Sequence, residues 1–140
     1  MSAVMFGAQK LGLIGRMPPR KITDGLLRAV GIHHKTPEPA KRALATLDHF
    51  AFGGVCGALF GLTHDVWRAR AQSSQRMRGD RAPIVAGIAY GMAIWATSYA
   101  GWVPLLDIMP APHKDRPGRP TAMVLAHGVF GGVLAKIVAA

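Results

Sequence analysis

The stretch "APIVAGIAYGMAIWATSYAGWVPLL", residues 82–106, contains no charged residue in 25 positions. A helix that crosses the hydrocarbon core of a bilayer needs about 20 consecutive apolar residues. Beyond aromatic, small and aliphatic side chains, residues 84–105 offer only Thr97 and Ser98. A soluble helical bundle requires a polar face on each surface helix, and this stretch has none. The segment therefore predicts a membrane-spanning helix.

Two further segments have the same character. Residues 120–135, "PTAMVLAHGVFGGVLA", are uncharged, and only Lys136 precedes the closing apolar residues. Between Arg42 and Arg68 the only charges are Asp48 and Asp65, near the two ends. The opening segment, residues 1–15, is apolar but reaches only about 22 Å at 1.5 Å per residue. The sequence predicts an all-α integral membrane bundle of four helices, about 1–15, 43–67, 82–106 and 120–140, in a single transmembrane domain spanning 1–140.

A short amphipathic helix is expected between the first two of these segments. Ile22, Leu26, Leu27 and Val30 recur at helical spacing with charged residues between them. That pattern is typical of a helix that lies in the membrane interface. We expect it at about residues 20–31.

A repeated motif suggests how the chain is organised. Residues 49–55 read "HFAFGGV" and residues 127–133 read "HGVFGGV", and a Met-Pro pair precedes each copy, at Met17 and Met109. Two tandem helix-hairpin units would explain this, with both histidine-headed helices running in one direction and both histidines at one depth. Chance similarity between Gly-rich helices is the alternative. Under the repeat, the first helix lacks about three turns, which predicts a start codon upstream of Met1.

Glycines spaced by four residues predict where the helices pack. Small residues at this spacing let two backbones approach closely inside a bilayer, where no hydrophobic drive brings helices together. We expect helix-packing roles for the glycines of three segments, namely Gly53, Gly57 and Gly61, then Gly87 and Gly91, and then Gly128 and Gly132.

The net charge of +10 is concentrated in the loops between the apolar segments. Basic clusters next to membrane helices contact anionic lipid headgroups and set topology, so nucleic acid is not an expected partner. The loop of residues 68–81 is the densest, which predicts that it and both termini are cytoplasmic. Its lipid-facing and topology-setting residues are expected to be Arg68, Arg70, Arg76, Arg78 and Arg81. The single cysteine, Cys56, offers no intrachain disulfide.

Histidines inside the apolar helices are the candidate functional residues. Polar groups at membrane depth are costly and usually point into the bundle. His49, His127 and His64, with Asp48 and Asp65 beside them, could form a metal site or a proton path, and paired histidines could also ligate haem iron. The competing interpretation is that each histidine simply hydrogen-bonds a neighbouring helix or a headgroup. No cofactor is expected, because nothing else in the chain marks a cofactor pocket, and no catalytic motif is present.

The layout resembles a family of uncharacterised bacterial inner-membrane proteins typified by YagU. The matching features are Pro18-Pro19-Arg20, the His49 and His127 helices, the Gly-rich third span and the Pro-rich loop 109–120. The resemblance implies a bacterial inner membrane and four helices, and it implies no activity. We expect a non-enzymatic, multi-pass accessory or scaffold protein that associates with other membrane subunits or with itself. The alternative is a small transporter or a proton or metal conduit that uses the histidines.

Overall fold

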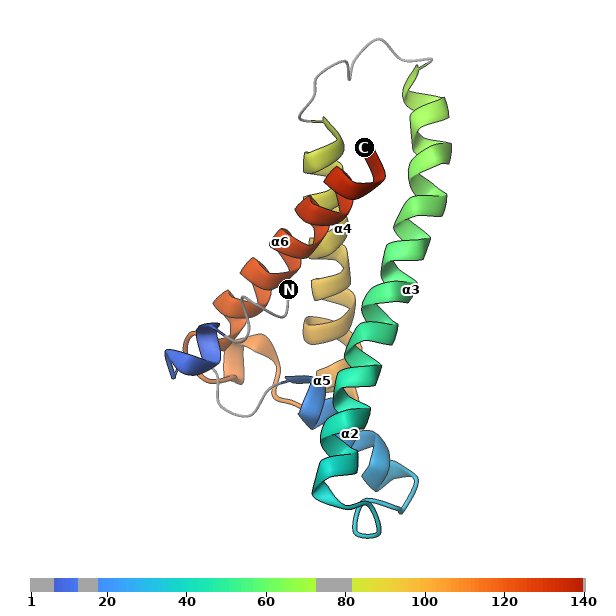
Figure 1. Cartoon of the computed structure of the whole chain (residues 1–140). Helices are drawn as coiled ribbons and strands as arrows, with labels where there is room; N and C mark the ends of the chain where they lie inside the picture. The colour runs from blue at the N-terminus through green and yellow to red at the C-terminus, as the bar shows by residue number, and fades with distance from the viewer. Residues whose placement is uncertain (1–6, 13–17, 73–81, 140) are drawn as a thin grey trace.

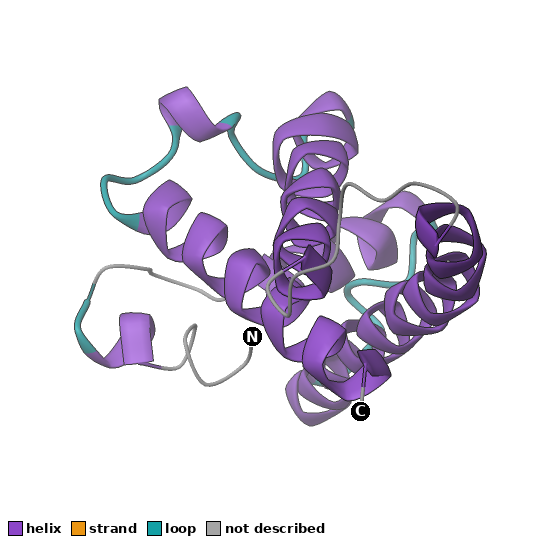
Figure 2. Cartoon of the chain, turned by 90° about the horizontal axis from the view of Figure 1, so that it is seen from above, coloured by secondary structure: helices purple, strands orange, loops and turns teal. Residues whose placement is uncertain are grey.

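A computed structural model describes residues 7–12, 18–72 and 82–139 of the chain. These residues form helices and loops, with no strand among them (Figure 1, Figure 2). The main helices are α2 (Pro18–Ala29), α3 (Glu38–Gln72), α4 (Ala82–Thr97) and α6 (Arg119–Ala139). A π-helical turn, η1 (Ser98–Trp102), and a short helix, α5 (Val103–Leu105), continue α4, and a 3₁₀ turn, η2 (Pro112–Lys114), precedes α6. The predicted all-α architecture is confirmed.

Each of the four main helices starts with a proline at its first or second residue, namely Pro18, Pro39, Pro83 and Pro120. Proline suits this position because its ring presets a helical φ and its missing N–H would have had no partner in the first turn. Glu38 adds an acidic side chain at the positive end of the α3 dipole. These signals explain why the helices begin where they do.

Three segments are long and apolar enough to cross a membrane, namely Glu38–His64, Pro83–Leu105 and Arg119–Val138. Large apolar side chains on α3 are exposed, including Leu47, Phe50 and Leu62. Lipid tails can cover such a surface, whereas water could not do so without a large free-energy cost. The three long apolar segments and the exposed apolar surface of α3 support the prediction of a membrane protein. Of the predicted helix at residues 1–15, only residues 7–12 are described, and residues 7–10 of these are helical.

The tightest packing in the described chain is between α4 and α6. A Cβ atom added at Gly87 would overlap the carbonyl oxygen of Gly131, and one added at Gly91 would overlap that of His127. The reverse also holds, since a Cβ at Gly131 would overlap the carbonyl oxygen of Gly87. The two backbones are therefore in direct contact, which only glycine permits.

Helix α3 stands further from this pair and diverges from it toward Gln72 (Figure 1). Tyr90 links the two parts, because its hydroxyl donates a 2.8 Å hydrogen bond to the carbonyl oxygen of Cys56 and its ring lies 5.0 Å from that of Phe60. At the other end, α2 packs along the start of α3 (Figure 1). A buried cluster that includes Tyr99, Val103, Met109 and Met123 fills the space beside α2.

The helix that begins at Ala82 changes its winding before Pro104. Val103 N–H bonds to the carbonyl oxygen of Ser98, five residues back, instead of four. Proline has no N–H to give and its ring collides with the carbonyl group four residues earlier, so a wider turn relieves the helix at this point. The predicted continuous helix 82–106 therefore has a π turn at residues 98–102. This turn lies at the end of the bundle where α2 packs.

Candidate functional site

A cavity of about 300 Å³ lies between α2, α3, the π turn and α6. His49 from α3 and His127 from α6 both line it. The other polar residues of its wall are Asp48, Ser98 and Tyr99. Most of the remaining wall is aliphatic, aromatic or thioether, contributed by Pro18, Pro19, Ile22, Leu26, Ala51, Phe52, Trp102, Val103, Met109 and Met123. The structure thus brings together the two histidines that head the repeated motif.

His127 is held in one tautomer by its own helix. The residue is only 2% exposed, and its Nδ1 lies 2.7 Å from the carbonyl oxygen of Met123. A carbonyl oxygen can only accept, so the neutral ring carries its proton on Nδ1. Nε2 is then the nitrogen with a free lone pair. The cavity wall therefore includes a hydrogen-bond acceptor, or a base, on the imidazole of His127.

Asp48 and His49 are adjacent on α3 and both line the cavity, where Asp48 is exposed and His49 is half-buried. The hydroxyl of Thr23 in α2 donates a 2.8 Å hydrogen bond to Oδ2 of Asp48. This contact fixes the carboxylate beside α2 and leaves Oδ1 as a further acceptor. Asp48 and the two motif histidines therefore line the same cavity.

The two hydroxyl groups of the π turn, on Ser98 and Tyr99, donate their hydrogen bonds to other protein atoms. Ser98 Oγ donates to the carbonyl oxygen of Ile94 at 2.6 Å. Tyr99 Oη donates to Oδ2 of Asp115 at 2.6 Å, and Asp115 also forms a buried ion pair with Arg119. Both hydroxyl oxygens keep their lone pairs for other partners.

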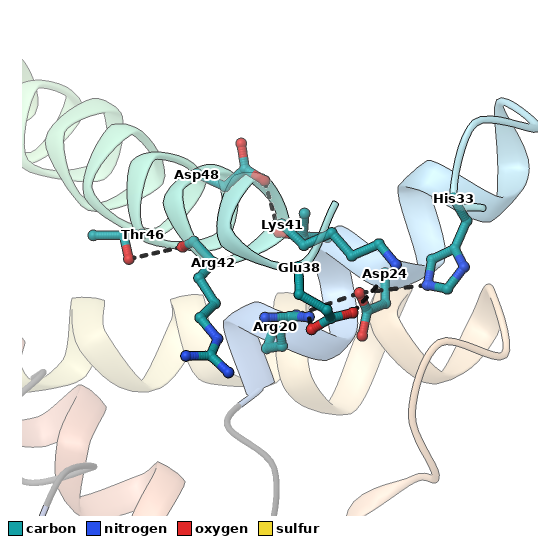
Figure 3. Close-up of polar contacts among 9 residues, drawn as sticks. Arg20, Asp24, His33, Glu38, Lys41, Arg42, Thr46 and Asp48 are labelled. Atoms are coloured by element: carbon teal, nitrogen blue, oxygen red, sulfur yellow. Dashed lines mark hydrogen bonds and ion pairs between the residues drawn. The ribbon is translucent and has the colours of Figure 1, made fainter. Parts of the chain in front are cut away.

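A second polar cluster ties α2 to the start of α3 (Figure 3). Arg20 forms ion pairs with Asp24 and Glu38, and Lys41 also contacts Glu38 at 3.4 Å. The hydrogen bond that Arg20 donates to Glu38, together with the attraction of Glu38 and Asp24, raises the pKa of Arg20 above its usual value. The cluster holds α2 in place as one wall of the cavity.

His33, in the loop after α2, lies at the edge of this cluster. Its Nε2 is 3.6 Å from Oδ1 of Asp24 (Figure 3). Desolvation lowers the pKa of His33, and the positive charges of Lys41 and Arg28 lower it further, outweighing the attraction of Asp24. The neutral ring is therefore favoured in the folded protein.

The other predicted site residues do not join the cavity. His64 is buried on α3, with its ring 5.8 Å from that of Phe60, and it is not part of the cavity wall. The side chains of Asp65, Arg68 and Arg70 lie outside the described residues, and so do the whole of Arg76, Arg78 and Arg81. In the part of the chain that the structure describes, no group of three His, Cys, Asp or Glu residues is placed to hold a metal ion.

The predicted packing glycines fall into two groups. Gly87 makes its backbone contact with Gly131, which the four-residue spacing did not select, and Gly91 makes its closest contact with the carbonyl group of His127. A Cβ at Gly128 would meet only Met92 Cε, at 3.8 Å, and a Cβ at Gly132 would meet only Ile88 Cγ1, at 3.7 Å. Both are ordinary van der Waals distances. On α3, a Cβ at Gly57 would meet Leu134 Cδ1 at 3.6 Å, and Gly53 and Gly61 have no neighbouring atom within 4 Å. The Gly53–Gly57–Gly61 face is therefore largely uncovered.

Sequence reasoning missed the contribution of Ser98, Tyr99 and Trp102 to the cavity. Aromatic residues near a helix end predict an interfacial belt or packing positions. The available signal was Pro104, whose position within an apolar helix marks a distortion of the preceding turn. A π turn inside a helix frequently occurs at a functional site.

No protein-family model, curated protein or solved structure matches this chain.

Proposed function

We propose that this membrane protein binds a small molecule in the cavity that His49 and His127 share. The observation that carries the proposal is that two histidines from different helices, 78 positions apart in the sequence, line one cavity of about 300 Å³. Ligand sites are typically concave, mostly apolar and equipped with a few converging polar groups, with volumes of about 300–1,000 Å³. The cavity wall has this composition.

The role that best fits these groups is binding or transport, with no catalysis. A small transporter that takes its ligand from the membrane interface would use the cavity as its binding site. A proton path through His49 and His127 is a narrower form of the same idea, since imidazole titrates near neutral pH. The proposal includes a multi-pass arrangement with the three candidate spans crossing the bilayer.

Filling the cavity tests this function directly. Ala51 lines the cavity from α3, whereas Ala43 is exposed on the same helix and does not line it. The protein is purified in mild detergent, and small molecules that travel with it are identified by mass spectrometry. We expect Ala51→Trp to lose a bound molecule that the unmodified protein and Ala43→Trp both retain. Equal content in all three proteins would contradict a ligand role for the cavity.

A second candidate role, as an accessory or scaffold subunit, is favoured by the uncovered glycine face of α3. Gly53, Gly54 and Gly61 have no atom within 4 Å of the position that a Cβ would occupy. Close approach of another helix, from a partner subunit or a second copy, is a common use of such a face. Gly53→Leu and Gly61→Leu should then abolish co-purification of a partner subunit without lowering thermal stability. Unchanged co-purification would exclude this use of the face.

We further propose a bacterial inner membrane as the location, as the resemblance to the YagU-like family implies. Anionic lipid headgroups are the expected partners of Arg68, Arg70, Arg76, Arg78 and Arg81. Both termini are proposed to be cytoplasmic.

A further inference from the structure

Four of the five polar residues of the cavity wall, all except His49, have no proton left to donate and retain lone pairs. The protons of Ser98 Oγ, Tyr99 Oη and His127 Nδ1 are all donated to other protein atoms. Asp48, as a carboxylate, has only acceptor oxygens. A ligand that lies against these groups gains hydrogen bonds if it brings donors, and it leaves them unpaired if it brings only acceptors.

The charge of the cavity wall points the same way. Among the described residues that line it there is one acid, Asp48, and there is no Lys or Arg. This local composition is opposite to that of the whole chain, which carries a net charge of +10. A positive ligand is thus attracted to the wall, and an anion is repelled by its carboxylate.

Aromatic rings complete the site. Phe52 from α3 and Tyr99 and Trp102 from the π turn line the same cavity. The faces of such rings attract cations, most strongly where water is excluded. Rings, a carboxylate and acceptor atoms around one apolar cavity are the features that recognise an organic cation.

We propose that the cavity binds a lipophilic ammonium ion, whose N–H groups donate to Asp48 and to Nε2 of His127 and whose apolar body lies against Phe52, Tyr99 and Trp102. This inference rests on the proposed function, since it names the chemical class of the ligand for that same cavity. The ammonium group can come from a free lipophilic amine or from the headgroup of an aminophospholipid. An anion or a neutral molecule without donors would leave the acceptors unpaired.

Four naphthalene probes separate charge from shape. 1-Naphthylmethylammonium carries charge and donors, 1-naphthylmethanol has a donor but no charge, 1-methylnaphthalene has neither, and 1-naphthylacetate is an anion. Binding is measured by calorimetry with the full chain in nanodiscs of phosphatidylcholine, against empty nanodiscs. The ammonium probe should bind about tenfold more tightly than the alcohol, because hydrogen bonds to charged groups are the stronger ones. The acetate should show no saturable binding.

Variants test the residue that carries the charge. Asp48→Asn keeps the acceptor for Thr23 but removes the negative charge, and it should weaken the ammonium probe about tenfold while leaving the alcohol unchanged. Asp48→Glu should restore part of the loss. Asp107→Asn is the matched control, since Asp107 is exposed in the loop after α5 and is not part of the cavity wall. Asparagine also tolerates the positive φ of 53° at this position.

The outcomes distinguish the inference from the proposed function. Equal affinities for the ammonium and alcohol probes, or no effect of Asp48→Asn, would overturn the ammonium assignment and leave the ligand cavity standing. Absence of saturable binding by every probe would overturn both. If the ammonium assignment holds, nanodiscs that contain phosphatidylethanolamine identify where the natural ammonium group comes from. Weaker binding of the ammonium probe in these nanodiscs indicates competition by the lipid headgroup. Unchanged affinity of the probe indicates a free amine.

Discussion

The main chain of Gly91 in α4 lies directly against the carbonyl group of His127 in α6, closer than a side chain at position 91 would allow. The imidazole of the same His127 lines the cavity and bonds back to Met123. One residue therefore belongs both to the tightest helix contact and to the candidate site. Packing of α4 on α6 sets where the acceptor nitrogen of His127 lies.

Gly91→Ala should destabilise the protein and displace His127. The added methyl group would overlap the carbonyl oxygen of His127, so the helices must separate, at a cost of about 1–3 kcal/mol for an overpacked contact. Gly128→Ala is the matched control, because its Cβ would meet only Met92 Cε at 3.8 Å. Thermal unfolding in detergent should show a clear loss for Gly91→Ala and little change for Gly128→Ala. Similar transition temperatures for the two variants would contradict the observed contact.

Acidification should loosen the junction between α2 and α3 through His33. Its pKa is lowered in the folded protein by desolvation and by Lys41 and Arg28. In the unfolded chain the pKa of His33 is about 6.5, and in the folded protein it is lower. The stability that the neutral ring contributes is therefore present above the pKa of the unfolded chain, and it is lost as the pH falls through the lower pKa of the folded protein. Hydrogen exchange, corrected for the intrinsic effect of pH, should show less protection of residues 18–37 at pH 5 than at pH 7.

His33→Gln and His34→Gln separate this effect from general acid sensitivity. His34 lies next to His33 and is exposed. The pH dependence of protection should be weakened in His33→Gln and retained in His34→Gln. The opposite pattern would assign the effect to another group.

Topology can be read with single cysteines. Cys56 is the only natural cysteine, and Cys56→Ala provides a background without thiols. In that background Ser74→Cys, in the 68–81 loop, should be protected from an impermeant maleimide in intact cells. His34→Cys, in the loop before α3, should be labelled. Labelling of position 74 alone would reverse the predicted orientation.

The fold was largely predictable because its signals are local. The absence of charge over residues 82–106 and the prolines at the helix starts each act within one segment. The close packing of Gly87 and Gly91 was also predictable from spacing. The contact of Gly87 with Gly131 and that of Gly91 with the carbonyl group of His127 were not, because the rotation of α6 about its axis depends on the contact itself and several glycines on that helix compete.

The candidate site was predictable only in part. Repetition of the motif singled out His49 and His127, and the structure places both on one cavity. The cavity itself depends on the π turn before Pro104 and on α2, which packs against α3 through Thr23 and Asp48. These are tertiary effects, so periodicity along a single helix does not reveal them.

The buried group of Tyr99, Asp115 and Arg119 should be the most sensitive polar feature of the described chain. Asp115 and Arg119 have side chains that are 2% and 3% exposed, and Asp115 also accepts the hydrogen bond of Tyr99. Asp115→Ala leaves the guanidinium buried without its carboxylate, which typically costs about 3–5 kcal/mol. Tyr99→Phe removes one hydrogen bond and should cost about 1 kcal/mol.

A double-mutant cycle on this ion pair checks the origin of the cost. Replacing both partners, in Asp115→Ala with Arg119→Met, should recover most of the stability lost in Asp115→Ala alone, because no unpaired charge then remains. Asp107→Asn, on an exposed acid, is the control and should be near neutral. Free energies of unfolding in mixed detergent, measured for the unmodified protein, for Asp115→Ala and Arg119→Met singly and for the double variant, give the coupling. If Asp115→Ala is no more costly than Tyr99→Phe, Arg119 is reached by water or lipid headgroups, and the pair does not hold the hydroxyl of Tyr99 in place beside the cavity.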